Sequence, residues 1–277
     1  MLKARPLLSW ILIALAASGA RAQDSVDAVQ AQRALIDAQI ARFEGVPDPH
    51  GRVYFLGFAG VGEERVFAEE IQLAAKRVGE RYGSSMRSVL LLNDRRDLTT
   101  WPLASQSSLR YALREIARVM NREEDVLFLA LSSHGSRGAV ISVSNTGMTE
   151  QGLSARTVAK LLDESGIRWR VVVVSACFSG AFIKPLADNH TIVITAAAKG
   201  RTSFGCSDQR DLTYFGEAFY RDAMPRSTYL RMTFEAARQE IRQREKDEDF
   251  TPSQPQSYFG PLMEEKLRAI EQAARSP

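Results

Sequence analysis

The sequence predicts an α/β fold, a three-layer αβα sandwich around a mostly parallel sheet of about six strands. Short apolar runs alternate along the chain with longer segments in which apolar residues recur at helical spacing. One run, Val171 to Val174, is four consecutive valines, which is typical of a strand buried on both faces. Strands that alternate with helices in this way favour a parallel sheet with helices on both sides.

Each predicted strand is a short apolar run that ends in turn residues. The strands are expected at residues 52–58, 88–92, 125–131, 170–174 and 191–197, with a short last strand at 257–259. The predicted helices carry apolar residues three and four apart on one face. They are expected at residues 24–43, 63–82, 105–121, 154–165, 213–223, 228–246 and 263–275, and a small hairpin is expected around 139–147. Right-handed crossovers would bring the carboxyl ends of the parallel strands to one edge of the sheet.

The first 22 residues have the pattern of a secretory signal peptide. Lys3 and Arg5 precede an apolar core that runs from residue 7 to residue 17, and Ala20-Arg21-Ala22 fits the cleavage pattern. The core is shorter than the about 20 residues that a membrane span needs, so we expect no stable membrane insertion after cleavage. The mature protein would be periplasmic or secreted. An uncleaved anchor is the alternative interpretation.

Three segments follow from this pattern. Residues 1–22 are the predicted signal peptide, residues 23–50 a helix and a linker, and residues 51–277 one large domain with helices at its carboxyl end. The whole chain has 36 basic and 33 acidic residues, and three of the basic residues lie in the signal, so the mature chain has no formal net charge. No Lys/Arg run with interleaved aromatic residues indicates a nucleic-acid partner. Metal-binding CxxC and HExxH pairs and nucleotide-binding glycine motifs are absent, so no metal and no organic cofactor is predicted.

Two predicted strands lead to reactive side chains. Strand 125–131 is followed by His134 and Gly135, and strand 170–174 is followed by Cys177. Because these strand ends should share one edge of the sheet, we expect the two side chains to lie close together. The nucleophile would be the thiolate, which a neighbouring imidazolium and the amides of a following helix favour. His134 would move the proton, and the Gly135 and Cys177 N–H groups would bind the oxyanion.

Structural interpretations of the same residues remain open at this point. Cysteine is among the most buried residue types, so Cys177 is also a candidate core residue, and it has Cys206 as a possible disulfide partner. His134 is also a candidate turn residue. Cys177 nevertheless follows its apolar run and has Ser and Gly around it, which favours the catalytic interpretation. His50 and His190 do not end apolar runs and are weaker candidates for a base.

These segments resemble motifs of the legumain family of cysteine peptidases, within the wider caspase-like group. Ser-Ser-His-Gly at 132–135 resembles the histidine motif of the group, and Ser-Ala-Cys-Phe-Ser-Gly at 175–180 resembles its nucleophile motif. Residues 202–206 and 213–217 resemble segments that build the primary specificity pocket of legumain. The resemblance runs from about residue 52 to residue 259. It implies a caspase-like fold with His134 as the base, Cys177 as the nucleophile and Gly135 as an oxyanion donor.

The resemblance also bears on the pocket for the P1 side chain. Ser203 falls on a serine of the legumain pocket, and Glu217 falls on its aspartate. The chain departs from the family pattern in two places. Residues 57–64 lack the Asn, Arg and His that the family has after the first strand, and Ser175 stands where the family has an acid two residues before the nucleophile. The preference of the family for asparagine at P1 therefore does not carry over.

The residues themselves indicate a different pocket. Ser175, Ser203 and Glu217 would form a polar, acidic pocket, with Asp208 and Asp211 nearby. Such a pocket favours a P1 side chain that donates hydrogen bonds, namely Asn, Lys or Arg. Lys199 and Arg201 would reverse this preference if they pointed inward, and solvated loop charges are the alternative interpretation.

The sequence thus predicts an exported, legumain-like cysteine endopeptidase that hydrolyses protein or peptide substrates through a thioester on Cys177. A transpeptidase or peptide ligase is the nearest alternative, because an amine can also capture an acyl-enzyme. A non-catalytic binding module that retains the fold is the third interpretation, and it requires an unreactive Cys177. The oligomeric state is not predicted.

Overall fold

The computed structural model describes residues 27–43, 51–97, 99–146, 148–149, 152–207 and 210–274. The predicted signal peptide, most of the predicted linker and the predicted pocket residue Asp208 lie outside these residues. The predicted N-terminal helix is present as a helix over residues 27–40. Within the described residues, every helix is too short or too polar to cross a membrane.

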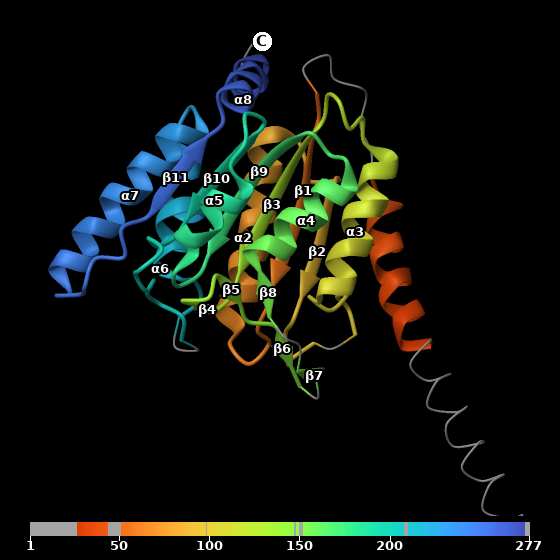
Figure 1. The fold of residues 1–277 in the computed structure, drawn as a ribbon, viewed down its shortest axis with the longest axis horizontal. Helices are drawn as coiled ribbons and strands as arrows, with labels where there is room; N and C mark the ends of the chain where they lie inside the picture. Colours follow the sequence, from red (N-terminus) through yellow and green to blue (C-terminus); the bar gives the residue numbers. More distant parts are fainter. Residues whose placement is uncertain are drawn as a thin grey trace, which may run out of the picture.

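A six-stranded sheet forms the middle layer of the molecule (Figure 1). Its strands are β1 (Val53–Ala59), β2 (Ser88–Leu92), β3 (Val126–Ser132), β9 (Trp169–Ser175), β10 (Thr191–Thr195) and β11 (Gln256–Phe259). They lie in the spatial order β11-β10-β9-β3-β1-β2, and all neighbours are parallel except β11, which pairs antiparallel with β10. The predicted fold class and the mostly parallel sheet are confirmed.

Helices cover both faces of this sheet, as the apolar runs require. One face carries α2 (Arg65–Tyr82), α7 (Leu230–Asp247), α8 (Pro261–Ala273) and a continuous helical segment made of α6 (Tyr214–Gly216), the π-helical η2 (Glu217–Ala223) and η3 (Met224–Arg226). The other face carries the helix at 27–40, α3 (Gln106–Val119), α4 (Ala155–Ser165), η1 (Ser179–Phe182) and α5 (Ile183–Leu186). Two apolar core clusters result, one on each side of the sheet.

The side chains of the central strands divide between these two clusters by alternation. In β3, Phe128 and Ala130 pack on the α2 side, whereas Leu129 and Leu131 pack on the α3 side. In β9, Val171 and Val173 pack on the α2 side. This alternation decides which residues at the strand ends face α2, and it therefore positions the site described below.

The segment between β3 and α4 folds into two small antiparallel sheets, where the sequence predicts one hairpin. The first contains β4 (Gly135–Ser136), β5 (Val140–Ile141) and β8 (Leu153–Ser154), and the second contains β6 (Ser144–Asn145) and β7 (Met148–Thr149). The Ser154 hydroxyl caps α4, as predicted, by accepting a hydrogen bond from the Thr157 N–H. The pairing of β4 with β5 holds the backbone in place directly after His134.

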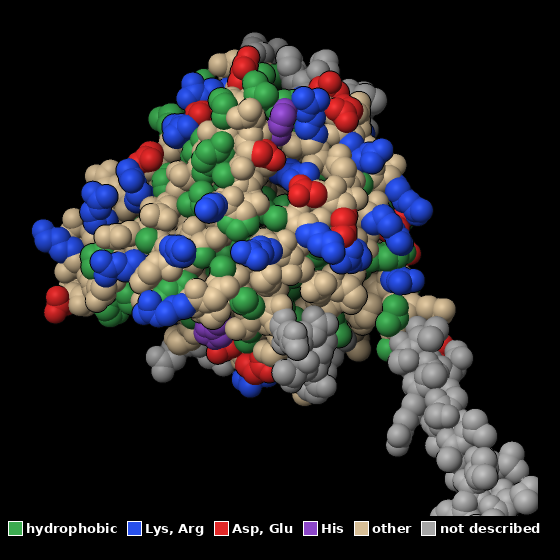
Figure 2. Space-filling view, viewed as in Figure 1, with side chains coloured by type: hydrophobic (Ala, Val, Ile, Leu, Met, Phe, Trp, Pro, Cys, Tyr) green, Lys and Arg blue, Asp and Glu red, His purple; other side chains and the backbone are tan. Residues whose placement is uncertain are grey.

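Lys and Arg side chains are spread over the outer face that carries α3, α4 and α5 (Figure 2). Several of them are paired with acids on the same surface. Arg110 of α3 contacts Glu164 of α4, which also lies 3.8 Å from Lys160. Exposed ion pairs of this kind contribute about 0–1 kcal/mol each, so this face owes its stability mainly to the apolar core beneath it.

Candidate active site

The structure brings His134 and Cys177 to the same edge and the same face of the sheet. The register of β3 and β9 ends at the pair Ser132 and Ser175, and each reactive residue lies two positions beyond its serine. The Ser133 N–H donates to the Ser175 carbonyl oxygen at 3.2 Å, so the two chains remain paired past the last strand residues. Because alternate residues share a face, both reactive side chains continue the α2 side of their strands.

Glu64 and the first turn of α2 hold the imidazole of His134. The Nε2 atom lies 3.0 Å from Oε1 of Glu64, the residue that precedes the first turn of α2. The ring of Phe67 meets the imidazole edge-on, with ring centroids 5.0 Å apart. A carboxylate only accepts hydrogen bonds, so Nε2 carries the proton in this pair and Nδ1 of the neutral ring is left to accept one. The His134 side chain is 40% exposed, which leaves it accessible.

The loop after β10 holds the thiol of Cys177. Its Sγ atom accepts a hydrogen bond from the Ser203 N–H at 3.3 Å and lies 3.6 Å from the Ser203 carbonyl oxygen. A short helical turn follows Cys177, as the sequence predicts, but Phe178 adopts a left-handed conformation with φ of 57° and η1 begins only after it. The amide that donates to sulfur is that of Ser203 in the loop. Cys177 and Cys206 are both free thiols, so the disulfide alternative is not realised.

Gly135 is required by close packing against the nucleophile segment. A Cβ atom at this position would overlap the carbonyl oxygen of Cys177 and approach its carbonyl carbon to 3.0 Å. The absence of a side chain at Gly135 thus lets the two strand ends come together. This packing does not test the predicted oxyanion role of its N–H, which stays a prediction.

A buried polar network lies beneath the two reactive residues. The Ser175 hydroxyl lies 3.3 Å from the Thr213 hydroxyl, and Thr213 donates to Oε2 of Glu70 from α2. Glu70 is fully buried, and Ser175 is 3% exposed. Burial raises the pKa of Glu70 to about 7, although the hydrogen bond from Thr213 acts in the opposite direction.

The predicted acidic pocket around Glu217 is wrong in its charge. The Glu217 carboxylate binds three arginines, with Arg210 at 2.5 Å, Arg221 at 3.0 Å and Arg244 closer still. These cations neutralise it, because a resemblance in sequence carries no information on the residues that surround a side chain in space. The exposed Asp211 likewise pairs with Arg65. Of the predicted pocket residues that are described, Ser203 contacts the Cys177 sulfur and Ser175 lies two residues before it in the chain.

Glu64 and Glu70 are the site residues that the sequence-based prediction missed. Glu64, Phe67 and Glu70 are spaced three residues apart, so they lie on one side of the start of α2. Glu64 and Phe67 contact His134, and Glu70 contacts Thr213. The helical pattern of the sequence does contain a signal for Glu70. Glu70 lies next to Ile71 on the predicted inner face of the helix, where a charged side chain needs a polar partner.

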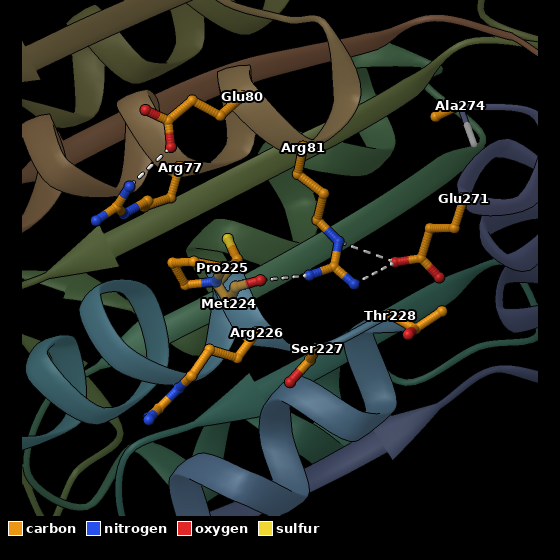
Figure 3. Close-up of a pocket in the computed structure, with 10 residues that line it drawn as sticks. All are labelled: Arg77, Glu80, Arg81, Met224, Pro225, Arg226, Ser227, Thr228, Glu271 and Ala274. Atoms are coloured by element: carbon orange, nitrogen blue, oxygen red, sulfur yellow. Dashed lines mark hydrogen bonds and ion pairs between the residues drawn. The ribbon is translucent and has the colours of Figure 1, made fainter. Parts of the chain in front are cut away.

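A cleft at the opposite end of α2 does not contain this chemistry (Figure 3). It has a volume of about 520 Å³ and is lined by residues of α2, η3 and α8. Arg81 points into it and is held by Glu271 at 3.1 Å and by the Met224 carbonyl oxygen at 3.1 Å. None of the residues that line this cleft is a cysteine or a histidine, so the cleft offers no Cys-His pair.

The six-stranded sheet and its helical layers form a caspase-like fold, and His134 and Cys177 lie at adjacent strand ends of that sheet. A crystal structure of caspase-1 from Spodoptera frugiperda is similar, with a TM-score of 0.53 and 10% sequence identity over 79% of this chain and 93% of that chain. The family model described as "Peptidase C13 family" matches residues 110–265, which is more than half of the chain. The chain therefore belongs to the peptidase C13 family, the legumain family. No curated protein matches the sequence.

Proposed function

We propose that this member of the family is an endopeptidase that hydrolyses peptide bonds through a Cys177–His134 dyad and a thioester intermediate. The observation that carries the proposal is the register of β3 and β9, which sets both residues two positions beyond a directly paired Ser132 and Ser175. The hydrogen bond from His134 to Glu64 supports it, because it leaves Nδ1 of the imidazole as the proton acceptor.

The proposed reaction begins with proton transfer from the Cys177 thiol to Nδ1 of His134. The thiolate attacks the carbonyl carbon, a C–S bond forms, and the carbonyl electron pair moves to the oxygen. The N–H groups of Gly135 and Cys177 are the expected donors to this oxyanion. His134 then protonates the leaving amine as the C–N bond breaks, which leaves a thioester. Water, deprotonated by His134, cleaves the thioester and restores the thiol.

A peptide assay with two variants tests this proposal. We expect the wild-type protein to cleave an internally quenched peptide library, and we expect Cys177→Ala and His134→Ala to reduce kcat by at least about 100-fold. Mass spectrometry of products formed with an added amine would show joined peptides if ligation, rather than hydrolysis, were the main reaction. Unchanged cleavage by Cys177→Ala would overturn the dyad.

We further propose that the protein is exported to the periplasm or secreted. The support is the charged start, the apolar core and the small-residue site within residues 1–22. Amino-terminal sequencing of the protein from the producing cell is expected to begin at Gln23. A mature protein that begins at Met1 and remains in the cytoplasm would contradict export.

A further inference from the structure

The region below Cys177 contains a fully buried acid that the proposed mechanism does not use. Resting on the proposed peptidase function, we propose that Glu70 is the base of the S1 pocket and selects a positively charged P1 side chain, lysine or arginine. The proposal thus names peptides with a basic P1 residue as the substrate class and Glu70 as the residue that determines this specificity. The reasons are the position of Glu70 in the fold, its unpaired oxygen and the absence of a cation beside it.

Strand alternation places Glu70 where a P1 side chain would arrive. Ser175 lies two residues before Cys177 in β9, on the same face of the sheet, and its hydroxyl belongs to the network that ends at Glu70. Thr213 is the N-cap of α6 and connects Ser175 to the Glu70 carboxylate. A side chain that points from the attacked carbonyl toward α2 therefore meets hydroxyl groups first and a carboxylate beyond them.

The loop after β10 forms the neighbouring wall of this region. Ser203 contacts the Cys177 sulfur, and the carbonyl oxygen of the next residue, Phe204, accepts a hydrogen bond from the Tyr214 N–H at 3.1 Å. Cys206 packs against the core cluster on the α2 side, and its thiol is influenced by both Cys177 and Glu70. The nucleophile, the loop and the acid thus lie on the same side of the sheet and are connected by these contacts.

The Glu70 carboxyl group lacks a partner that a ligand would supply. Its Oε1 atom is buried and has no hydrogen-bond partner within the described residues, and the same is true of the Ser132 hydroxyl beside it. A buried carboxylate oxygen without a donor is unfavourable. The N–H groups of a lysine or arginine side chain are donors that match this oxygen and add the missing positive charge.

Among the described residues, no positive charge already neutralises Glu70. No ion pair to Glu70 is formed by the described Lys and Arg residues, whereas Glu217 a short distance along the chain binds three of them. The titratable groups that face Glu70 are the Cys206 thiol from the loop and the Tyr220 hydroxyl from η2. Burial raises the pKa of Cys206 to about 12 and the pKa of Tyr220 well above its usual value, so both are neutral.

The test compares two peptides that differ only in the charge at P1. Arginine and its neutral isostere citrulline have nearly the same shape, so the ratio of their kcat/KM values reports charge recognition alone. We expect this ratio to be at least tenfold for the wild-type protein at pH 8.5 and to fall when the pH is lowered to 5.5, where Glu70 binds a proton. We expect Glu70→Gln to bring the ratio close to one at both pH values while citrulline cleavage continues.

Two further variants separate this inference from its rivals. Glu80→Gln removes an exposed acid from the same helix, where Glu80 pairs with Arg77, and is expected to leave the ratio unchanged. Glu217→Gln tests the acid that the resemblance places in the pocket. The inference is overturned if Glu70→Gln retains the wild-type ratio, if only Glu217→Gln lowers it, or if asparagine is preferred to arginine at pH 8.5. If no peptide is cleaved at all, the peptidase proposal itself fails and the inference falls with it.

Discussion

The Nε2 atom of His134 lies 3.0 Å from Oε1 of Glu64, although the two residues are 70 positions apart in the chain. Glu64 precedes α2, the helix that follows β1, whereas His134 follows β3, the strand beside β1 in the sheet. The bond fixes the imidazole between a carboxylate on one side and the open edge of the sheet on the other. It therefore selects the tautomer that can act as a base at Nδ1.

Removal of the Glu64 carboxylate should weaken catalysis without removing the dyad. We expect Glu64→Ala to lower kcat by about 10–100-fold, because the imidazole loses the acceptor that orients it, and we expect little change in KM. Glu64→Gln should recover part of the activity, since its amide oxygen can accept the same hydrogen bond. Steady-state kinetics over a range of pH will check this. The neighbouring Glu63→Gln is the matched control, because Glu63 bonds Ser144 rather than His134.

Gly135 should tolerate no side chain. We expect Gly135→Ala to destabilise the protein by about 1–3 kcal/mol, because the new methyl group overlaps the Cys177 carbonyl oxygen and pushes the strand ends apart. The displaced nucleophile should also lower kcat by about 100-fold. Denaturant unfolding and peptide cleavage measure the two effects.

Gly138 provides the control for this substitution, because it lies in the same segment. A Cβ atom there would meet no atom closer than 3.6 Å, so Gly138→Ala should change neither stability nor activity appreciably. Equal effects of the two alanine variants would show that close packing at Gly135 is not what constrains the segment.

The elements that depend on local pattern are the ones that the sequence predicts well. The four valines of β9 and the apolar run of β3 are strands buried on both faces, and their ends converge because parallel strands share an edge. His134 and Cys177 follow from that geometry. Gly135 follows as a candidate oxyanion donor, whereas its close contact with the Cys177 carbonyl group is seen only in the structure.

The residues that contact the site side chains are distant from them in sequence, so the sequence does not predict these contacts. Glu217 matches a family pocket residue by position, but three arginines from a loop, a π-helix and α7 surround it. Glu70 has no counterpart in the motifs, and only the packing of α2 against α6 shows that it meets Thr213. Charge in a pocket is a property of the assembled neighbours, so a motif match alone does not show whether an acid is already paired.

The buried Glu70 should make stability fall as pH rises. Its pKa is about 7 in the folded protein against 4.5 for the unperturbed group, so the folded state binds more protons between these pH values. Stability linked to this group is therefore greatest below about pH 4.5, decreases through pH 7 and levels off above it. The difference corresponds to about 3 kcal/mol at 1.36 kcal/mol for each pKa unit.

Glu70→Gln isolates this contribution, because the amide does not titrate. We expect the free energy of unfolding of the variant, relative to wild type, to increase by about 3 kcal/mol between pH 4 and pH 9. Urea unfolding of both proteins at several pH values measures the difference and cancels the titration of all other groups. A difference that stays constant with pH would mean that Glu70 has the same pKa in the folded and the unfolded chain.

The two cysteines should differ sharply in reactivity. Burial raises the pKa of Cys206 to about 12, and the neighbouring Cys177, Glu70 and Glu64 act in the same direction, so almost no Cys206 thiolate exists at pH 7. Cys177, at the sheet edge beside His134, is expected to react first with iodoacetamide, and peptide mapping should find one modified cysteine. His134→Ala should slow that modification, whereas Cys206→Ser should not. Equal modification of both cysteines in the folded protein would contradict a nucleophile confined to Cys177 and would favour the non-catalytic interpretation of this fold.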